Sequence, residues 1–224
     1  RSPNCVALAP SIEIAPMSDI AVIVLAAGLS RRMGAINKLL LFIGNDTLLC
    51  RVVSACAEVS DHPVTVVTGH QQAAVTFAMG DAPVNFVHNC QFEEGQMTSV
   101  DAGLRGAPRA ETYLIALGDQ PNIKSGNLRD LLAAHHAKAD GRITVPVVGG
   151  IRGNPIVVPA AQRTLMLADP VNLGCRKLTR NRPERVHQFV TDDACFITDI
   201  DTLEDLASTR LNLIEKVTSL DAML

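Results

Sequence analysis

The sequence predicts an α/β fold in which a mostly parallel β-sheet carries helices on both faces. Short runs of β-branched and apolar residues recur along the 224-residue chain. Several of them, including Ile20–Ala26 and Val64–Thr68, are apolar throughout, as strands covered on both faces are. Stretches with helical periodicity lie between the runs. This alternation of strand and helix is typical of βαβ units on a parallel sheet.

Strands and helices are expected to follow one another in a regular order. The expected strands are 20–26, 64–68, 84–87, 113–117, 142–148, 156–158, 185–190 and 195–198. The expected helices are 46–59, 71–79, 97–105, 125–139, 160–168 and 203–217. In the first helix, Leu48, Val52 and Cys56 recur at helical spacing. Before the last one, Thr202 and Asp205 form the pattern of a capping box.

The chain is long enough to bury a large core, and we expect one domain over residues 19–218. Residues 1–18 contain three prolines and little periodicity, so we expect them to be a tail or a remnant outside the fold. Residues 219–224 are expected to form a short C-terminal tail.

The composition argues against nucleic-acid and membrane partners. The chain has 20 Lys and Arg against 23 Asp and Glu, a net charge of −3, whereas nucleic-acid binders usually carry a basic excess. Its most apolar stretch, residues 20–29, is about half as long as a membrane span. The six cysteines show no spacing typical of a zinc site. We interpret them as reduced thiols of a cytoplasmic protein.

The loop after the first strand has the features of a phosphate-binding site. Ligands of such sheets bind beyond the carboxyl ends of the strands. Here the strand ends in small residues, Gly28 and Gly34 flank a basic loop, and Lys38 follows. Small residues let backbone N–H groups approach a phosphate, and Arg32 and Lys38 can neutralise it. The alternative is an ordinary strand-to-helix turn with solvated arginines.

Carboxylates follow two other expected strands. Asp119 comes directly after an apolar run, and Asp199 and Asp201 precede the last expected helix. Together they could hold Mg²⁺, which prefers hard oxygen ligands and shares them with phosphates. The alternative is that these acids only cap helices or turns.

A glycine turn that contains Arg152 and Asn154 suits an anionic second substrate, and it could equally be a plain hairpin. His70 lies at a strand end and could contact a ligand, although a loop histidine is the commoner case. His135 and His136 are adjacent, so they cannot chelate together on a helix, and we expect them on a solvated face.

In this order the motifs resemble the nucleotidyltransferases of molybdenum cofactor biosynthesis, the MobA-like NTP transferases, with the cytidylyltransferase branch nearest. The matching segments are Leu25-Ala-Ala-Gly28-x-Ser30-x-Arg32-Met33-Gly34 with Lys38-Leu-Leu, Thr68-Gly-His70, Asn89 with Ser99, Leu117-Gly-Asp119-Gln-Pro121, Arg152-Gly-Asn154-Pro, Gly174-x-Arg176 and Asp199-Ile-Asp201-Thr. They extend over nearly the whole of the expected domain.

The resemblance implies a Rossmann-like three-layer sandwich that transfers CMP from CTP to a phosphorylated pterin acceptor and releases pyrophosphate. The implied cofactor is Mg²⁺, the implied acceptor is of the molybdopterin type, and handover of the product to a molybdoenzyme or its chaperone is compatible with it. Ala27 and Gln120 stand where GTP-using relatives have other residues, which favours CTP.

The resemblance also implies a role for each matching residue. The catalytic residues would be Lys38, Arg32 and Asp119. The nucleotide would contact Leu25, Ala26, Ala27, Gly28, Ser30, Arg32, Gly34, Lys38, Gly69, His70, Gly118 and Gln120. The acceptor would contact Ser99, Arg152, Asn154 and Arg176, and the metal ligands would come from Asp119, Asp199 and Asp201.

Three alternatives to this function stay open. The first is a transferase of the same fold that uses GTP or another phosphorylated acceptor. The second is a NADPH-dependent oxidoreductase of the same fold. The third is a non-catalytic regulator that binds nucleotides, against which the presence of Lys38 and Asp119 argues.

Overall fold

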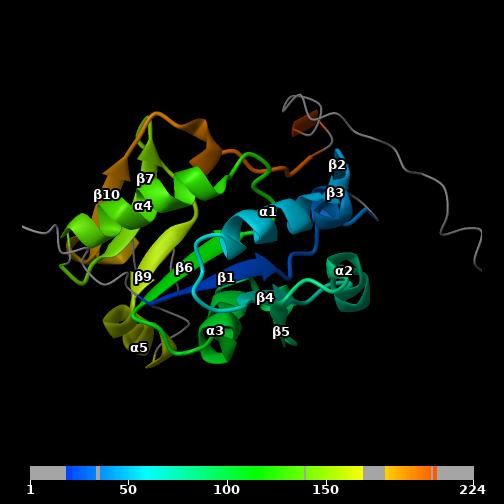
Figure 1. The fold of residues 1–224 in the computed structure, drawn as a ribbon, viewed down its shortest axis with the longest axis horizontal. Helices are drawn as coiled ribbons and strands as arrows, with labels where there is room; N and C mark the ends of the chain where they lie inside the picture. The colour runs from blue at the N-terminus through cyan, green and yellow to red at the C-terminus, as the bar shows by residue number, and fades with distance from the viewer. Residues whose placement is uncertain (1–18, 34–35, 139, 169–179, 203, 206–224) are drawn as a thin grey trace, which may run out of the picture.

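The computed structural model describes residues 19–33, 36–138, 140–168, 180–202 and 204–205. One eight-stranded sheet has the order β10-β7-β9-β6-β1-β4-β5 (Figure 1), and β8 is paired to β7. Its strands are β1 (Ile20–Ala26), β4 (Val64–Thr68), β5 (Val84–His88), β6 (Thr112–Leu117), β7 (Ile143–Val148), β8 (Ile151–Arg152), β9 (Ile156–Pro159) and β10 (Val186–Val190). A separate pair is formed by β2 (Phe42–Ile43) and β3 (Asp46–Thr47).

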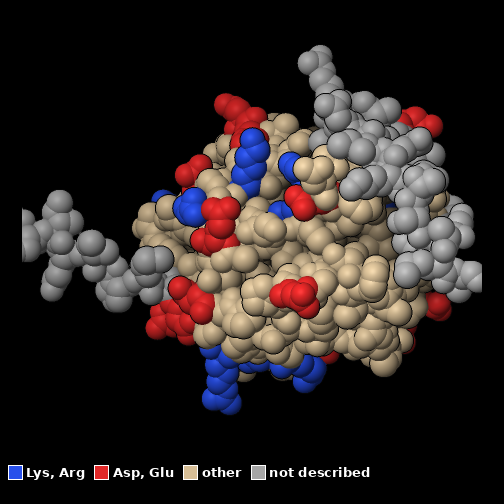
Figure 2. Space-filling model, turned by 45° about the vertical axis from the view of Figure 1, so that its right-hand side comes forward, with Lys and Arg blue, Asp and Glu red and all other residues tan. Residues whose placement is uncertain are grey.

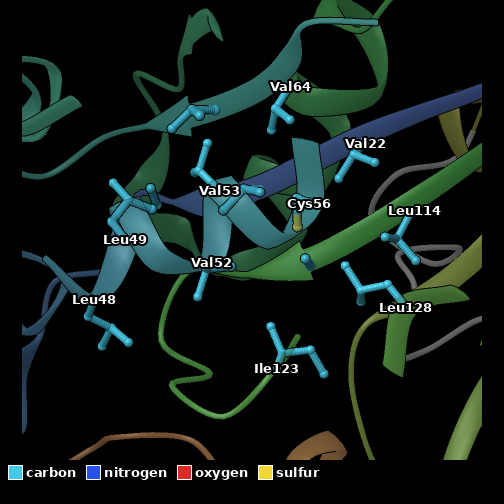
Figure 3. Packing of buried hydrophobic residues seen from close by; sticks show 14 of the residues in the cluster. Val22, Leu48, Leu49, Val52, Val53, Cys56, Val64, Leu114, Ile123 and Leu128 are labelled. Carbon is cyan, nitrogen blue, oxygen red and sulfur yellow. The ribbon is translucent and has the colours of Figure 1, made fainter. Parts of the chain in front are cut away.

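Helices cover both faces of this sheet, as the apolar strands predict. The helices are α1 (Leu48–Ala57), α2 (Gln72–Met79), α3 (Gln96–Gly106), α4 (Ser125–Lys138) and α5 (Ala160–Ala168). Val22 and Val24 of the central strand β1 belong to the core with α1, α2 and α4, which Figure 3 shows in part. Ile23 and Leu25 belong to a second core with α3 and α5. The two cores confirm the three-layer α/β sandwich, and β1 is buried on both sides of it.

The sheet is parallel around β1 and reverses at β9. Strands β4 and β6 run parallel to β1, and β5 runs parallel to β4. Strand β9 runs antiparallel to both of its neighbours, β6 and β7. Only residues 149–155 connect β7 to β9, and a crossover to a parallel strand needs a dozen residues or more. The short connection therefore forces the reversal.

Two predictions about local structure are wrong. Residues 195–198 are not a strand: Ala194–Phe196 form a 3₁₀ turn, capped by the Asp193 carboxylate, which accepts a hydrogen bond from the Cys195 N–H at 3.0 Å. His135 is not solvated. It is 9% exposed and hydrogen-bonds through Nδ1 to Thr144 Oγ1 at 2.8 Å.

The expected helix over 203–217 lies mostly outside the described residues, but its capping box is present. The Asp205 N–H donates to Thr202 Oγ1 at 3.1 Å, and the Thr202 N–H donates to the Asp205 carboxylate at 2.8 Å. The first helix begins at Leu48 rather than 46, because Asp46 and Thr47 pair with β2 and the Thr47 hydroxyl caps α1.

On the face shown in Figure 2, acidic and basic side chains of the described residues are intermingled. Within the described ranges, no helix is both long and apolar enough to cross a membrane.

The buried position of His135 leads to a prediction about stability in acid. Burial, together with the nearby His136 and His187, lowers the pKa of His135 from 6.5 to about 4. The unfolded chain therefore takes up this proton first as the pH falls. The resulting stabilisation is fully present above pH 6.5 and is lost as the pH falls towards 4.

Between pH 6.5 and 4, we expect the free energy of unfolding of the unaltered protein to fall ~2 kcal/mol more than that of His135→Gln, allowing for partial hydration of the ring. Denaturant unfolding at each pH measures it. The less buried neighbour provides the control variant, His136→Gln, which should change the profile less. An H135Q profile that parallels that of the unaltered protein would contradict this account.

Candidate functional site

A cleft of about 620 Å³ opens where the predicted site residues converge. Its wall is formed by the loop after β1, by Lys38, by the start of α3 and by the acidic residues that follow β6 and precede residue 202. The residues that line it are Leu25, Ala27, Gly28, Leu29, Ser30, Arg31, Arg32, Lys38, Leu39, Phe92, Glu93, Gly95, Gln96, Ser99, Leu117, Asp119, Asp199 and Asp201.

The loop after β1 is held in a fixed curve over this cleft. Ser30 adopts a left-handed backbone conformation (φ 47°), and its hydroxyl accepts a hydrogen bond from the Lys38 N–H at 3.3 Å. A 3₁₀ turn, Arg31–Met33, follows and buries Met33. At Gly28 an added Cβ would meet no atom within 4 Å, so the backbone there is open to a ligand. Such loops offer N–H groups to phosphate oxygens.

Lys38 joins the loop to the acidic side of the cleft. Its Nζ donates to Asp119 Oδ2 at 2.7 Å and to Asp201 Oδ1 at 2.8 Å. Arg32 also pairs with Asp201. The Lys38 side chain is 12% exposed. Burial by itself would lower the pKa of Lys38, but the two ion pairs outweigh burial and raise it. Lys38 is therefore a fixed positive charge in this site.

The three carboxylates form a cluster that suits a divalent cation. One oxygen each from Asp119, Asp199 and Asp201 lies within 4.8 Å of the others. Asp119 Oδ1 is buried and has no hydrogen-bond partner among the described residues. Burial and the neighbouring Asp119 and Asp201 raise the pKa of Asp199. Hard oxygens with an unsatisfied atom and crowded negative charge fit Mg²⁺ or Mn²⁺.

The two acidic segments are held together by backbone and side-chain bonds. The Ile200 N–H donates to the Asp119 carbonyl at 3.1 Å, and the Ile200 side chain is fully buried. Next to Asp119, the Gln120 amide nitrogen donates to the carbonyls of Asn154 (3.0 Å) and Phe196 (3.2 Å). A third carbonyl, that of Cys195, lies at 3.4 Å. Gln120 does not line the cleft. Its amide links the segment after β6 to Asn154 and to residues 195–196.

Several residues predicted to contact the nucleotide do not line this cleft. Ala26, Gly69, His70, Gly118 and Gln120 are not among the described residues that line it. A Cβ at Gly69 would lie 2.6 Å from that of Phe92 and 2.8 Å from that of Ala27, so this glycine allows close packing. The His70 N–H donates to the Ala27 carbonyl at 3.4 Å. Gln120 is 2% exposed. Gly34 and Arg176 lie outside the described residues.

The residues predicted for the acceptor divide between two cavities. Arg152 and Asn154 line a second cavity of about 340 Å³, which shares Leu25, Gln96, Leu117 and Asp199 with the first. Ser99 lines the first cleft, where its hydroxyl accepts a hydrogen bond from Asn89 Nδ2 at 3.0 Å. Asp199 lines both cavities, so a second substrate bound in the second one would lie beside a carboxylate of the acidic cluster.

Sequence reasoning missed several residues on these walls. Arg180 lines the second cavity, and Gln96 lines both. Arg180 belongs to no motif, and no local signal could have identified it. Gln96 is the first residue of α3 and lies between Asn89 and Ser99, which belong to one of the matching segments, so its position near the site could have been predicted from the sequence.

Comparison with known proteins gives relatives of different activities. The chain is 26% identical over 200 residues to the molybdenum cofactor cytidylyltransferase of Escherichia coli, covering 87% of this chain and 97% of that protein. It is 28% identical over 192 residues to the nicotine blue oxidoreductase of Paenarthrobacter nicotinovorans, covering 82% and 93%. It is 35% identical over 127 residues to the bifunctional protein GlmU of Xanthomonas campestris pv. campestris, covering 56% of this chain and 27% of GlmU.

Solved structures share the fold. The Rv0371c protein of Mycobacterium tuberculosis aligns with a TM-score of 0.74 and 26% identity, covering 87% of this chain and 98% of that chain. Its complex with manganese aligns with a TM-score of 0.68 and 24% identity, covering 85% and 97%. The family model of the MobA-like NTP transferase domain matches residues 22–187, well over half of the chain. The chain therefore belongs to the MobA-like NTP transferase domain family.

Proposed function

We propose that this protein transfers CMP from CTP to a phosphorylated acceptor of the molybdopterin type and releases pyrophosphate. One observation carries the proposal: Lys38 bridges Asp119 and Asp201 on the wall of the cleft that the loop after β1 also lines. That arrangement brings a fixed cation, an acidic cluster and a glycine loop to one place, as a triphosphate and a divalent ion require.

The reaction needs no nucleophile from the protein. An oxygen of the acceptor's phosphate attacks the α-phosphorus of the nucleotide, a new P–O bond forms, and the bond to the β-phosphate breaks with release of pyrophosphate. The backbone N–H groups of residues 28–32 and the Arg32 guanidinium bind the β- and γ-phosphates. Lys38 Nζ neutralises charge on the α-phosphate. Catalysis then rests on positioning and charge stabilisation.

The acidic cluster would hold a divalent cation, which we propose to be Mg²⁺. Asp119, Asp199 and Asp201 supply the ligand oxygens, and the unpaired buried Asp119 Oδ1 supports this assignment. The manganese complex of the Rv0371c protein is a further support. When bound, the ion offsets negative charge on the phosphates.

The choice of CTP rests on the cleft wall beside β1. Ala27 lines the cleft together with Phe92, and the Ala27 Cβ takes up space on this wall that a glycine would leave open to a base. A purine needs more room than a pyrimidine there. The cytidylyltransferase relative, which the chain matches over 87% of its length, supports the same nucleotide and acceptor. Such a product would be handed to a molybdoenzyme or its chaperone.

A second candidate, a NADPH-dependent oxidoreductase, is favoured by one observation: the similarity to nicotine blue oxidoreductase covers 93% of that protein. Hydride transfer gives no role to a lysine clamped between metal-binding carboxylates, and so the transferase is preferred.

Two assays separate these candidates. With Mg²⁺ and an acceptor preparation, we expect pyrophosphate release from CTP to exceed that from GTP, ATP and UTP. We expect no oxidation of NADPH at 340 nm. CTP at ~100 times its dissociation constant should also add ~2.7 kcal/mol to the stability, visible as a thermal shift. A preference for GTP would contradict the CTP assignment, and NADPH turnover would contradict the transferase.

Removing the bridging cation tests the mechanism. We expect Lys38→Ala to lower kcat about a hundredfold or more, since the loss of one charge-stabilising donor typically costs ~3 kcal/mol. Lys124→Ala is the matched control, because Lys124 is exposed and does not line the cleft. Circular dichroism should show that both variants are folded. Turnover by K38A equal to that of K124A would refute the assigned role.

Gln120 allows a test that distinguishes a brace from a nucleotide contact. Gln120→Leu keeps the volume but removes the donor to three carbonyls, which should cost ~1–3 kcal/mol of stability. Because the brace holds Asp119 beside the 195–201 segment, kcat should fall, while the dissociation constant of CTP stays nearly unchanged. Calorimetric unfolding and CTP titration measure the two effects. Weaker CTP binding at unchanged stability would instead place Gln120 against the nucleotide.

A further inference from the structure

Asn89, the residue directly after β5, is 4% exposed and uses its whole side-chain amide in hydrogen bonds. Its Oδ1 accepts from the Gln91 N–H at 2.9 Å. Its Nδ2 donates to Thr98 Oγ1 at 2.9 Å and to Ser99 Oγ at 3.0 Å. Because a backbone N–H can only donate, the bond from Gln91 fixes which end of the amide is oxygen. The Asn89 nitrogen therefore faces the two hydroxyl groups as a donor.

The donor of Asn89 restricts the direction of the Ser99 hydroxyl. Ser99 Oγ uses one lone pair to accept from Asn89, so its own proton has to point elsewhere. In the described part of the chain, Ser99 Oγ has no second hydrogen-bond partner. Ser99 is 4% exposed and lines the first cleft but not the second. A nearly buried hydroxyl with an unused proton on a cleft wall suits an oxygen atom of a ligand.

The neighbouring hydroxyl of Thr98 has a different use. Thr98 Oγ1 also accepts from Asn89, but it lies 2.8 Å from the Gln91 carbonyl and 2.9 Å from the Gly95 carbonyl, and it can donate to either. Thr98 lines neither cavity. Its hydroxyl therefore closes the turn over residues 91–95, whereas the Ser99 proton is left for the cleft.

We propose that Asn89 is a positioning residue for nucleotide binding: its amide directs the Ser99 hydroxyl, as a donor, at an oxygen atom of the bound nucleotide. We call this chain of hydrogen bonds the Asn89–Ser99 relay. The inference rests on the proposed function, because it concerns the nucleotide that occupies the first cleft. It assigns Ser99 to the nucleotide rather than to the acceptor, since Ser99 lines only that cleft. Asn89 lines neither cavity and acts through Ser99.

The benefit of the relay is pre-organisation. A serine hydroxyl in water rotates and forms hydrogen bonds with the solvent, so binding has to stop the rotation and displace the water. The bond from Asn89 already restricts the Ser99 hydroxyl, and burial already removes most of its water. Its proton is therefore available to the nucleotide at little further cost.

A double-mutant cycle tests the relay through the dissociation constant of CTP with Mg²⁺, measured by isothermal titration calorimetry. Asn89→Asp keeps the acceptor for Gln91 but replaces the donor with an oxygen, towards which the Ser99 proton then turns. Ser99→Ala removes that proton. We expect N89D and S99A each to weaken CTP binding about tenfold, and the double variant to bind no more weakly than S99A. The kcat at saturating CTP and the KM of the acceptor should stay nearly unchanged.

Further variants separate the relay from effects of charge and packing. Asn85→Asp adds the same charge at an exposed position of β5 and should leave CTP binding unchanged. Thr98→Val breaks the other bond of the Asn89 amide, so it should lower the melting temperature and affect CTP far less than N89D does.

Asn89→Ala is a second variant that adds no charge, and it keeps the test available if N89D does not fold. It should weaken CTP binding less than N89D, because the Ser99 hydroxyl is released rather than turned away. Its effect should also vanish in the S99A background.

An S99A variant that binds CTP as tightly as the unaltered protein would overturn the inference. So would losses that add up in the double variant, or an S99A variant in which the KM of the acceptor rises and CTP binding is unchanged. If the unaltered protein binds GTP instead of CTP and the same cycle holds with GTP, the nucleotide of the proposed function is wrong and the relay stands. If it binds neither nucleotide, both are wrong.

Discussion

The ion pairs of Lys38 with Asp119 and Asp201 are the interaction on which the site depends. They cross the cleft between the loop after β1 and two acidic segments that lie about eighty residues apart in the chain. Three carboxylates in one cleft repel one another, and burial together with this repulsion raises the pKa of Asp199. Lys38 offsets that repulsion at two of the three acids. In the proposed reaction, a divalent ion and the phosphates of the nucleotide would share these charges.

The fold provides the precision that this arrangement requires. Strands β1 and β6 are neighbours in the sheet, so the loop after β1 and Asp119 emerge side by side. Gln120 and the Ile200 N–H then tie the 195–201 segment to the end of β6. Buried hydrogen bonds of this kind are costly to break, because a buried polar group left without a partner has lost its hydration uncompensated. The acids are therefore held by the core rather than by flexible surface loops.

Much of the fold could be predicted from the sequence because buried strands and helices carry apolar residues at regular spacing. The continuous apolar run of β1 matches its burial between two layers of helices. The reversal at β9 was open in the sequence only as the alternative of a plain hairpin at the glycine turn, although the short connection over residues 149–155 excludes a parallel crossover. Cys195 and Phe196 are apolar and buried, yet they form a turn, because burial does not fix backbone angles. His135 follows Leu128 and Leu131 on the buried stripe of α4, so its burial could have been inferred from helical spacing.

The site was predictable in part for the same reason. Strand ends meet at one edge of a parallel sheet, which is why Lys38 and Asp119 were expected together. Asp201 follows a 3₁₀ turn instead of the expected strand, and the Ile200 N–H ties its segment to the Asp119 carbonyl. The positions of Gln120 and Arg180 depend on contacts between distant segments, and no local pattern records those. The Leu117-Gly-Asp119-Gln-Pro121 motif led to the prediction that Gln120 contacts the nucleotide. In the structure, the Gln120 side chain donates to the backbone carbonyls of Asn154 and Phe196.

The most direct test of the central claim is a crystal structure with Mn²⁺ and a non-hydrolysable CTP analogue, with the metal located by its anomalous scattering. The account requires one Mn²⁺ peak among Asp119, Asp199 and Asp201, with the triphosphate against residues 28–32 and Lys38. A metal bound elsewhere, or a triphosphate bound away from that loop, would contradict it.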